Sequence, residues 1–224
     1  MWIKVDPDLH KDFPNLRALL CSVNSVKVGK ESKELLAFKE QVVTEVQKAY
    51  DLDALRDLPI FRVYRDFFWR VGIDPTKIRP ASEALVRRIL SGKPIPRINT
   101  LVDAYNLASI KTEIAIAAFD RDKLEGELLL RYARTGELFY GIGWPEERKL
   151  RGGEIVTSDA RKLVAIYPYR DADDSKITLQ TKYVLLLICG VPGIEDQKLK
   201  EAAQVTIEYI KRFCGGIGKI GLIN

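Results

Sequence analysis

Three polar side chains share one face of a predicted helix near the middle of the chain. Asn99, Asp103 and Asn106 follow one another at intervals of four and three residues, which places them on one side of a helix. Asn and Asp compete for backbone hydrogen bonds, so a row of three on a helix needs an explanation. One explanation is capping, with Asn99 or Thr100 as the N-cap and Asp103 favoured in the first turn. The other is a polar rim on a ligand pocket.

Basic residues gather around this helix. Residues 76–111 carry seven basic and two acidic side chains, which accounts for the whole net charge of +5, since the rest of the chain holds 29 of each sign. A local basic excess on a neutral background fits a phosphate-binding surface, although a solvated helix face rich in arginine would show the same pattern. The predicted phosphate-binding cations are Arg79, Arg87, Arg88, Lys93, Arg97, Lys111, Lys176 and Lys182. Because Arg87 and Arg88 are neighbours on a helix, we expect one to face the groove and the other to be structural.

The composition excludes several kinds of site. His10 is the sole histidine and lies in a stretch that looks exposed, which argues against a Ser–His–Asp or Cys–His catalytic centre. Cys21, Cys189 and Cys214 lack zinc-binding spacings and are predicted to be reduced, buried thiols. No glycine-rich phosphate loop or nucleophile elbow occurs. We therefore expect neither a metal nor a cofactor.

The overall composition is that of a folded protein. Of 224 residues, 46% are hydrophobic and 30% charged, which is enough apolar material for one large domain or two small ones. The chain begins without a signal-peptide pattern and has no apolar run long enough to cross a bilayer, so we expect a cytoplasmic protein. Abundant Lys, Arg and Glu with few labile residues also suggest a thermophilic source.

Hydrophobic periodicity predicts the elements that position these residues. The predicted helices cover residues 31–50, 57–71, 80–91, 100–110 and 195–213. The predicted strands cover residues 19–28, 114–119, 127–132, 137–140, 154–157, 162–167 and 183–188. This order predicts an α+β fold, with a helical N-terminal part followed by a mostly antiparallel sheet domain with flanking helices. A turn at Asp74–Pro75 divides the chain into an N-terminal helical extension (1–74), a sheet-containing domain (75–216) and a C-terminal tail (217–224).

Four stretches resemble a known family in their order and spacing across residues 75–216. They are residues 77–85, residues 99–106, residues 118–124 with Gly126, and residues 174–178 leading to Thr181–Lys182. Together they resemble the editing module (B-three/B-four domain) of the phenylalanyl-tRNA synthetase beta subunit. The free-standing proteins built from that module are still more similar, and residues 1–74 fit their helical N-terminal extension.

The resemblance implies an α+β domain that binds the acylated 3′ end of a tRNA and hydrolyses the ester when the wrong amino acid is attached. Because no adenylate-forming motif is present, hydrolysis would act in trans, on aminoacyl-tRNA already released. The implied partner is tRNA, not DNA or a membrane. Ala117 stands where the synthetase-embedded module usually carries a histidine, so the tyrosine specificity of that module does not carry over. A non-catalytic module that binds tRNA, other RNA or an amino acid therefore remains an alternative.

An aminoacyl ester is already activated, so a positioned water and donors for the developing oxyanion could suffice for its hydrolysis. The hypothesis assigns Asn106 and Asp103 to position substrate or water. Glu154, or an acid of residues 171–174, would bind the α-amino group. The predicted catalytic residues are Asn106, Asp103 and Glu154, and the predicted substrate-binding residues are Asn99, Ser109, Ala117, Asp173 and Asp174.

Overall fold

Two long apolar strands form the centre of the molecule. The computed structural model describes residues 1–222, and in it β2 (Ala18–Asn24) and β10 (Tyr183–Cys189) are buried along almost their whole length. They pair antiparallel in a four-stranded sheet of order β11-β2-β10-β3, completed by β3 (Ala115–Asp120) and β11 (Ile217–Ile220). Continuous rather than alternating hydrophobicity in β2 and β10 indicates a sheet covered on both faces.

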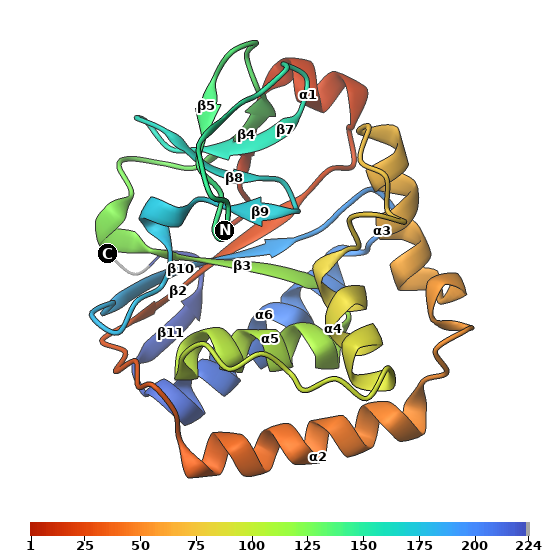
Figure 1. The fold of residues 1–224 in the computed structure, drawn as a ribbon. Coiled ribbons are helices and arrows are strands. Elements are labelled where there is room, and N and C mark those ends of the chain that lie inside the picture. Colours follow the sequence, from red (N-terminus) through yellow and green to blue (C-terminus); the bar gives the residue numbers. More distant parts are fainter. Residues whose placement is uncertain (223–224) are drawn as a thin grey trace.

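Helices cover one face of this sheet. α5 (Thr100–Thr112) and α6 (Asp196–Cys214) lie against it, and α2 (Lys33–Ala49) lies outside them (Figure 1). α4 (Ala81–Leu90) packs beside α5, where Val86 and Ile89 join Leu35 of α2 in a second apolar cluster. Because it is enclosed on nearly all sides, α5 buries ten of its thirteen residues.

A second sheet covers the opposite face (Figure 1). Its order is β1-β4-β7-β8-β9, formed by β1 (Lys4–Val5), β4 (Leu129–Tyr132), β7 (Ile155–Ser158), β8 (Leu163–Ile166) and β9 (Arg170–Asp171). Only the β1–β4 pair is parallel among these pairings of the described chain. A hairpin of β5 (Leu138–Phe139) and β6 (Arg148–Lys149) extends from this sheet.

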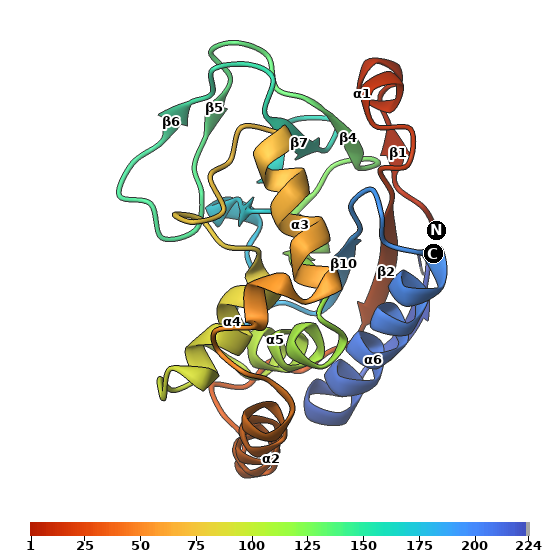
Figure 2. The same cartoon turned by 90° about the vertical axis from the view of Figure 1, so that its right-hand side faces the viewer.

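The remaining helices close the ends and the side of the stack. α3 (Pro59–Arg70) lies along the side (Figure 2) and inserts Tyr64, Phe67 and Phe68 into the main core. α1 (Pro7–Asp12) follows β1, and three short 3-10 turns complete the described elements: η1 (Leu55–Asp57), η2 (Arg121–Lys123) and η3 (Asp173–Ser175). Within residues 1–222, no helix combines the length and the apolar character needed to cross a membrane.

The predicted α+β class and its long elements are confirmed, and residues 217–220, which were assigned to a C-terminal tail, form a strand that the sequence did not predict. These residues form β11 and pair with β2, and residues 223–224 lie outside the described chain. β2, from the predicted N-terminal extension, lies between β11 and β10 in the same sheet. The central sheet therefore draws strands from all three predicted parts, because its pairings join segments far apart in sequence.

Candidate functional site

A pocket of about 200 Å³ lies between the two sheets at their junction with α5. We call it the inner pocket. α5 contributes Tyr105 and Asn106, and β3 contributes residues 115–117. The rest of the wall comes from β8, β9 and the segment between them, from β10, from Ala81 at the start of α4, and from Ile142 in the β5–β6 loop. Most of this wall is apolar, so the polar groups of Asn106 and Asp171 stand out within it.

A wider groove of about 670 Å³ adjoins the inner pocket, and we call it the basic groove. Six cations line it: Lys77, Arg79, Arg87, Arg88, Lys93 and Arg170. No acidic side chain lines it in the described part of the chain. Asn106, Tyr169 and Arg170 border both spaces, so the inner pocket opens onto the basic groove. Unopposed positive charge of this kind favours an anionic ligand such as a phosphate chain.

Arg87 and Arg88 both line the groove, so the prediction that only one of them would face it is wrong. Arg87 lies 3.7 Å from Glu83, whose fully buried carboxylate also accepts from Arg65 at 3.1 Å. Arg88 donates through Nε to the carbonyl of Pro94 at 2.5 Å. The groove is bounded both by α4 and by the connector that follows it, which is why two adjacent residues reach it.

Asp171 is the acidic residue of the inner pocket. Burial raises the pKa of its carboxyl to about 7, against the opposing effects of the Arg170 guanidinium and the backbone N–H of Ala118. A carboxyl of this kind changes charge near neutral pH. A cation entering the pocket would favour its ionised form.

The β5–β6 loop covers one side of the pocket. The Ile142 amide donates to the Asp171 carbonyl at 2.9 Å, and Arg170 Nη1 donates to the Ile142 carbonyl at 3.0 Å. Gly141 permits this close approach, because a Cβ there would lie 2.6 Å from Cγ of Arg170. The guanidinium of Arg170 also lies 5.2 Å from the ring centre of Tyr169. These contacts hold Ile142 and Arg170 at the pocket entrance.

The polar row on α5 does not share one cavity. Asn99 is the N-cap, and its Oδ1 accepts from the amides of Leu101 and Val102 at 3.1 and 2.9 Å, as the capping explanation predicts. Asp103 is buried in an ion pair with Lys39 of α2. Asn106 alone of the three lines the pocket. The first turn of α5 is enclosed by α2 and the connector, whereas Tyr105 and Asn106 are half-buried and face the opening.

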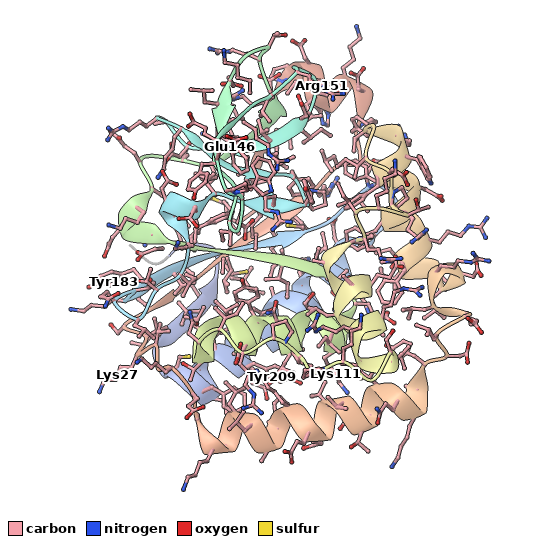
Figure 3. All side chains as sticks on the ribbon, viewed as in Figure 1. Lys27, Lys111, Glu146, Arg151, Tyr183 and Tyr209 are labelled. Atoms are coloured by element: carbon pink, nitrogen blue, oxygen red, sulfur yellow. The ribbon has the colours of Figure 1, made fainter. Side chains whose placement is uncertain are left out.

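The other predicted substrate and catalytic residues are dispersed. Ala117 lines the inner pocket, and Ser109 donates to the Ile114 carbonyl at 2.6 Å in the core. Glu154 accepts from the amide of Arg151, which lies at the far end of the second sheet (Figure 3). Neither Glu154 nor the two predicted acids of η3 line the pocket. Asp173 pairs with Lys176 at 2.7 Å and Asp174 with Lys162 at 2.6 Å.

Four of the predicted phosphate-binding cations do not line the groove: Arg97, Lys111, Lys176 and Lys182. Lys111 lies between α5 and α2 (Figure 3), 3.7 Å from Glu45. Sequence reasoning missed Arg170 and Tyr169. It offered Glu154 or an acid of residues 171–174 as the group that binds the α-amino group, and it did not choose Asp171. The feature of the sequence that could have pointed to these residues is the Tyr-Arg-Asp run at 169–171, which places an aromatic, a basic and an acidic side chain next to one another. Its place beside α5 depends on tertiary packing that periodicity does not reveal.

Metal-binding side chains are not clustered. Among residues 1–222, no group of three or more His, Cys, Asp or Glu side chains comes together in a way that could hold an ion. Cys189 lines the floor of the inner pocket, and burial raises the pKa of its thiol well above the usual range, so it is held as a neutral thiol.

Known proteins are similar to this chain in sequence or in fold. The phenylalanine–tRNA ligase beta subunit of Symbiobacterium thermophilum is 28% identical over 148 residues, which cover 66% of this chain and 16% of that protein. The same subunit of Fusobacterium nucleatum is 30% identical over 114 residues, or 51% of this chain and 14% of that protein. The chain thus spans a small part of these relatives.

A solved N-terminal fragment of the phenylalanyl-tRNA synthetase beta subunit from Pyrococcus horikoshii has the same fold. It aligns with a TM-score of 0.51 over 96% of this chain and 49% of that fragment, at 14% sequence identity. Residues 63–215 match the B3/4 domain, a region that includes the inner pocket and all six cations of the basic groove. The chain therefore belongs to the B3/4 domain family.

Proposed function

We propose that this protein is a trans-acting hydrolase that removes a wrongly attached amino acid from tRNA. One observation carries the proposal: a small, mostly apolar pocket opens directly onto a groove lined by six cations and no acid within the described chain. The 3′ end of an aminoacyl-tRNA has the same two parts, a side chain joined to a run of phosphates. In this proposal the amino acid enters the inner pocket and the acceptor-end phosphates lie in the basic groove.

The site residues take roles that follow from their positions. Asn106, at the junction of pocket and groove, donates its amide N–H to the ester carbonyl oxygen or to the attacking water. Asp171 binds the α-ammonium group of the amino acid as a carboxylate. Ala117 forms part of the wall that contacts the side chain. Asn99, Asp103 and Ser109 have internal hydrogen-bond or ion-pair partners and support α5 without touching substrate.

The reaction needs no cofactor. The oxygen of a water molecule attacks the ester carbonyl carbon, and negative charge develops on the carbonyl oxygen. The bond from that carbon to the ribose oxygen then breaks, and the ribose oxygen takes up the proton that the water loses. The products are a free amino acid and a tRNA with its terminal hydroxyl restored. Because the ester is activated, a positioned water and one or two oriented donors supply enough assistance.

The beta-subunit names of the relatives support a tRNA substrate, although the chain spans only 16% of the first relative described above. We therefore propose editing without ligation, by an enzyme acting in the cytoplasm on aminoacyl-tRNA that a ligase has released. The absence of an imidazole at Ala117 supports the second candidate, a module that binds tRNA or an amino acid without catalysis. Both candidates use the basic groove, and they differ in whether the ester is lost.

A deacylation assay over a panel of mischarged tRNAs separates the two candidates. The panel pairs one tRNA with a series of noncognate amino acids of increasing side-chain size, and ester loss is followed with and without the protein. Editing predicts accelerated ester loss for amino acids whose side chains fit a cavity of about 200 Å³. Tight binding of the same tRNAs with no acceleration for any of them would support the non-catalytic module.

A further inference from the structure

We infer that Lys39 of α2 is a positioning residue for the basic groove, acting from the far side of its wall through the buried ion pair with Asp103. The inference rests on the proposed function, because it concerns how the groove holds tRNA. Lys39 lies outside residues 63–215, the part of the chain that matches the B3/4 domain. The N-terminal segment would therefore contribute to the substrate site without lining it.

The geometry of the pair leads directly to the connector between α4 and α5. Lys39 Nζ lies 2.6 Å from Asp103 Oδ2, and the two side chains are 7% and 5% exposed. The same Nζ donates to the carbonyl of Pro96 at 3.0 Å. The other carboxylate oxygen of Asp103, Oδ1, accepts from the amide of Ile98 at 3.0 Å. Each member of the pair thus also binds the connector backbone.

The connector, residues 93–98, forms one wall of the basic groove. Lys93 and Pro96 line the groove, and Arg88 binds the Pro94 carbonyl from the groove side. This segment has no regular secondary structure, and its two prolines supply no N–H groups for backbone pairing. Ile95 packs into the second apolar cluster, and two cations bind the carbonyls on either side of it: Arg88 at Pro94 on the exposed side and Lys39 at Pro96 on the buried side.

Stability alone does not account for a buried ion pair at this place. Removing two charges from water costs about as much free energy as their attraction returns, and well-packed apolar residues often serve stability equally well. Apolar side chains of the same size could fill the space between α2 and α5, but they could not bind the Pro96 carbonyl or the Ile98 amide. The distinctive effect of the pair is to fix the wall that carries Lys93.

The test replaces both charges together, with Lys39→Met and Asp103→Leu in one chain. The matched control is Glu34→Gln with Arg212→Gln, which removes an exposed ion pair of 2.7 Å between α2 and α6, away from the groove. We expect the apolar variant to bind uncharged tRNA about tenfold more weakly, a loss equivalent to about 1.4 kcal/mol, while the control binds like wild type. In deacylation, KM should rise by a similar factor and kcat should stay nearly unchanged, because the inner pocket is intact.

Hydrogen exchange at the Ile98 amide provides a readout that does not depend on activity. The amide should exchange faster in the apolar variant and at the wild-type rate in the control. If the apolar variant is unstable, Lys39→Met with Asp103→Asn serves in its place, since it leaves no unpaired charge buried and still removes the donor to the Pro96 carbonyl. Lys39→Arg should restore tRNA binding.

Two results would overturn the inference: unchanged protection of Ile98, or unchanged tRNA affinity despite faster exchange. A lower melting temperature, combined with wild-type tRNA affinity at temperatures where the variant is still folded, would likewise show that the pair only stabilises the protein. Failure of the proposed function is a different result, in which the wild-type protein itself neither binds nor deacylates tRNA. In that case the Ile98 exchange rate still decides whether the pair holds the connector.

Discussion

The inner pocket and the basic groove share Asn106 and Arg170 but are built in opposite ways. The pocket is formed mainly by strands and α5, is mostly apolar, and holds one carboxyl whose pKa is raised by burial to about 7. The groove is formed mainly by α4, its flanking segments and exposed cations, and no acid lines it within residues 1–222. Under the proposed function, this difference means that tRNA affinity should depend on salt through the groove, whereas selection of the amino acid should depend on pH through the pocket.

The largest effect is expected where the two spaces meet. Asn106→Ala should lower kcat/KM for deacylation by about 100-fold, the usual loss when one donor to a developing oxyanion is removed. The half-buried side chain has no structural partner of the kind that holds Asn99 or Asp103, so stability should change by less than about 1 kcal/mol. Steady-state kinetics and thermal unfolding check both parts. A large loss of stability with normal activity per folded molecule would instead make Asn106 structural.

The pocket carboxyl should give the next largest effect. Asp171→Asn should lower kcat/KM by about tenfold or more, since a hydrogen bond to a charged group contributes about 1.5–3 kcal/mol. In the wild type, activity should rise with pH as Asp171 ionises near its pKa of about 7, whereas the variant should lack this rise. A pH profile of kcat/KM, compared between the two proteins, decides whether the rise belongs to Asp171.

Stability should change with pH in the opposite sense. The Asp171 pKa of about 7 in the folded state lies above the ordinary value of about 3.9 for an unfolded chain. Between these values the folded state holds a proton that the unfolded state has lost, so this residue makes unfolding easier as pH rises toward 7. Asp171→Asn should remove this part of the pH dependence. Urea unfolding of both proteins across that range measures the difference, and identical slopes would count against a raised pKa.

Single substitutions of the groove cations should have smaller, additive effects on tRNA affinity. Arg79→Ala and Lys93→Ala should each weaken tRNA binding a few-fold and lower the slope of log affinity against log salt by about one. Lys182→Ala serves as the control, because Lys182 is exposed but does not line the groove. Binding titrations at several salt concentrations provide the comparison. An equal effect of Lys182→Ala would mean that the phosphates lie elsewhere.

The smallest effect on activity is expected at Asn99, the same residue type on the same helix as Asn106. Asn99→Ala should destabilise the protein by about 1 kcal/mol, because the amides of Leu101 and Val102 lose their acceptor. Deacylation by the folded variant should remain close to that of the wild type. Activity loss matching that of Asn106→Ala, at full stability, would place Asn99 at the substrate instead.

The sequence predicted the long elements well and their neighbours in space poorly. α2, α3 and α6 carry regular apolar periodicity, which local sequence reveals. β9 and β11 are short, and they exist only because β8 and β2 lie beside them in the fold. A pairing between distant segments leaves no local pattern, and this is why residues 217–220 were predicted to be a tail.

The same limit applies to the site. Local charge predicted Arg79, Arg87, Arg88 and Lys93 as groove residues, since α4 and its flanks are contiguous in sequence. Asp103 was predicted to touch substrate because its face of α5 could be identified, but its partner Lys39 is 64 positions earlier in the chain. Asp171 reaches α5 only through the packing of the second sheet, so the sequence left the choice of acid open between Glu154 and the stretch of residues 171–174.

The most direct test of the account is the rate of ester loss from mischarged tRNA with wild-type protein and with Asn106→Ala, each at low and high salt. The proposed function predicts rapid deacylation by the wild type and a value of kcat/KM about 100-fold lower in the variant. Higher salt should raise KM and leave kcat nearly constant. Wild-type protein that binds the mischarged tRNAs but accelerates ester loss from none of them would contradict it.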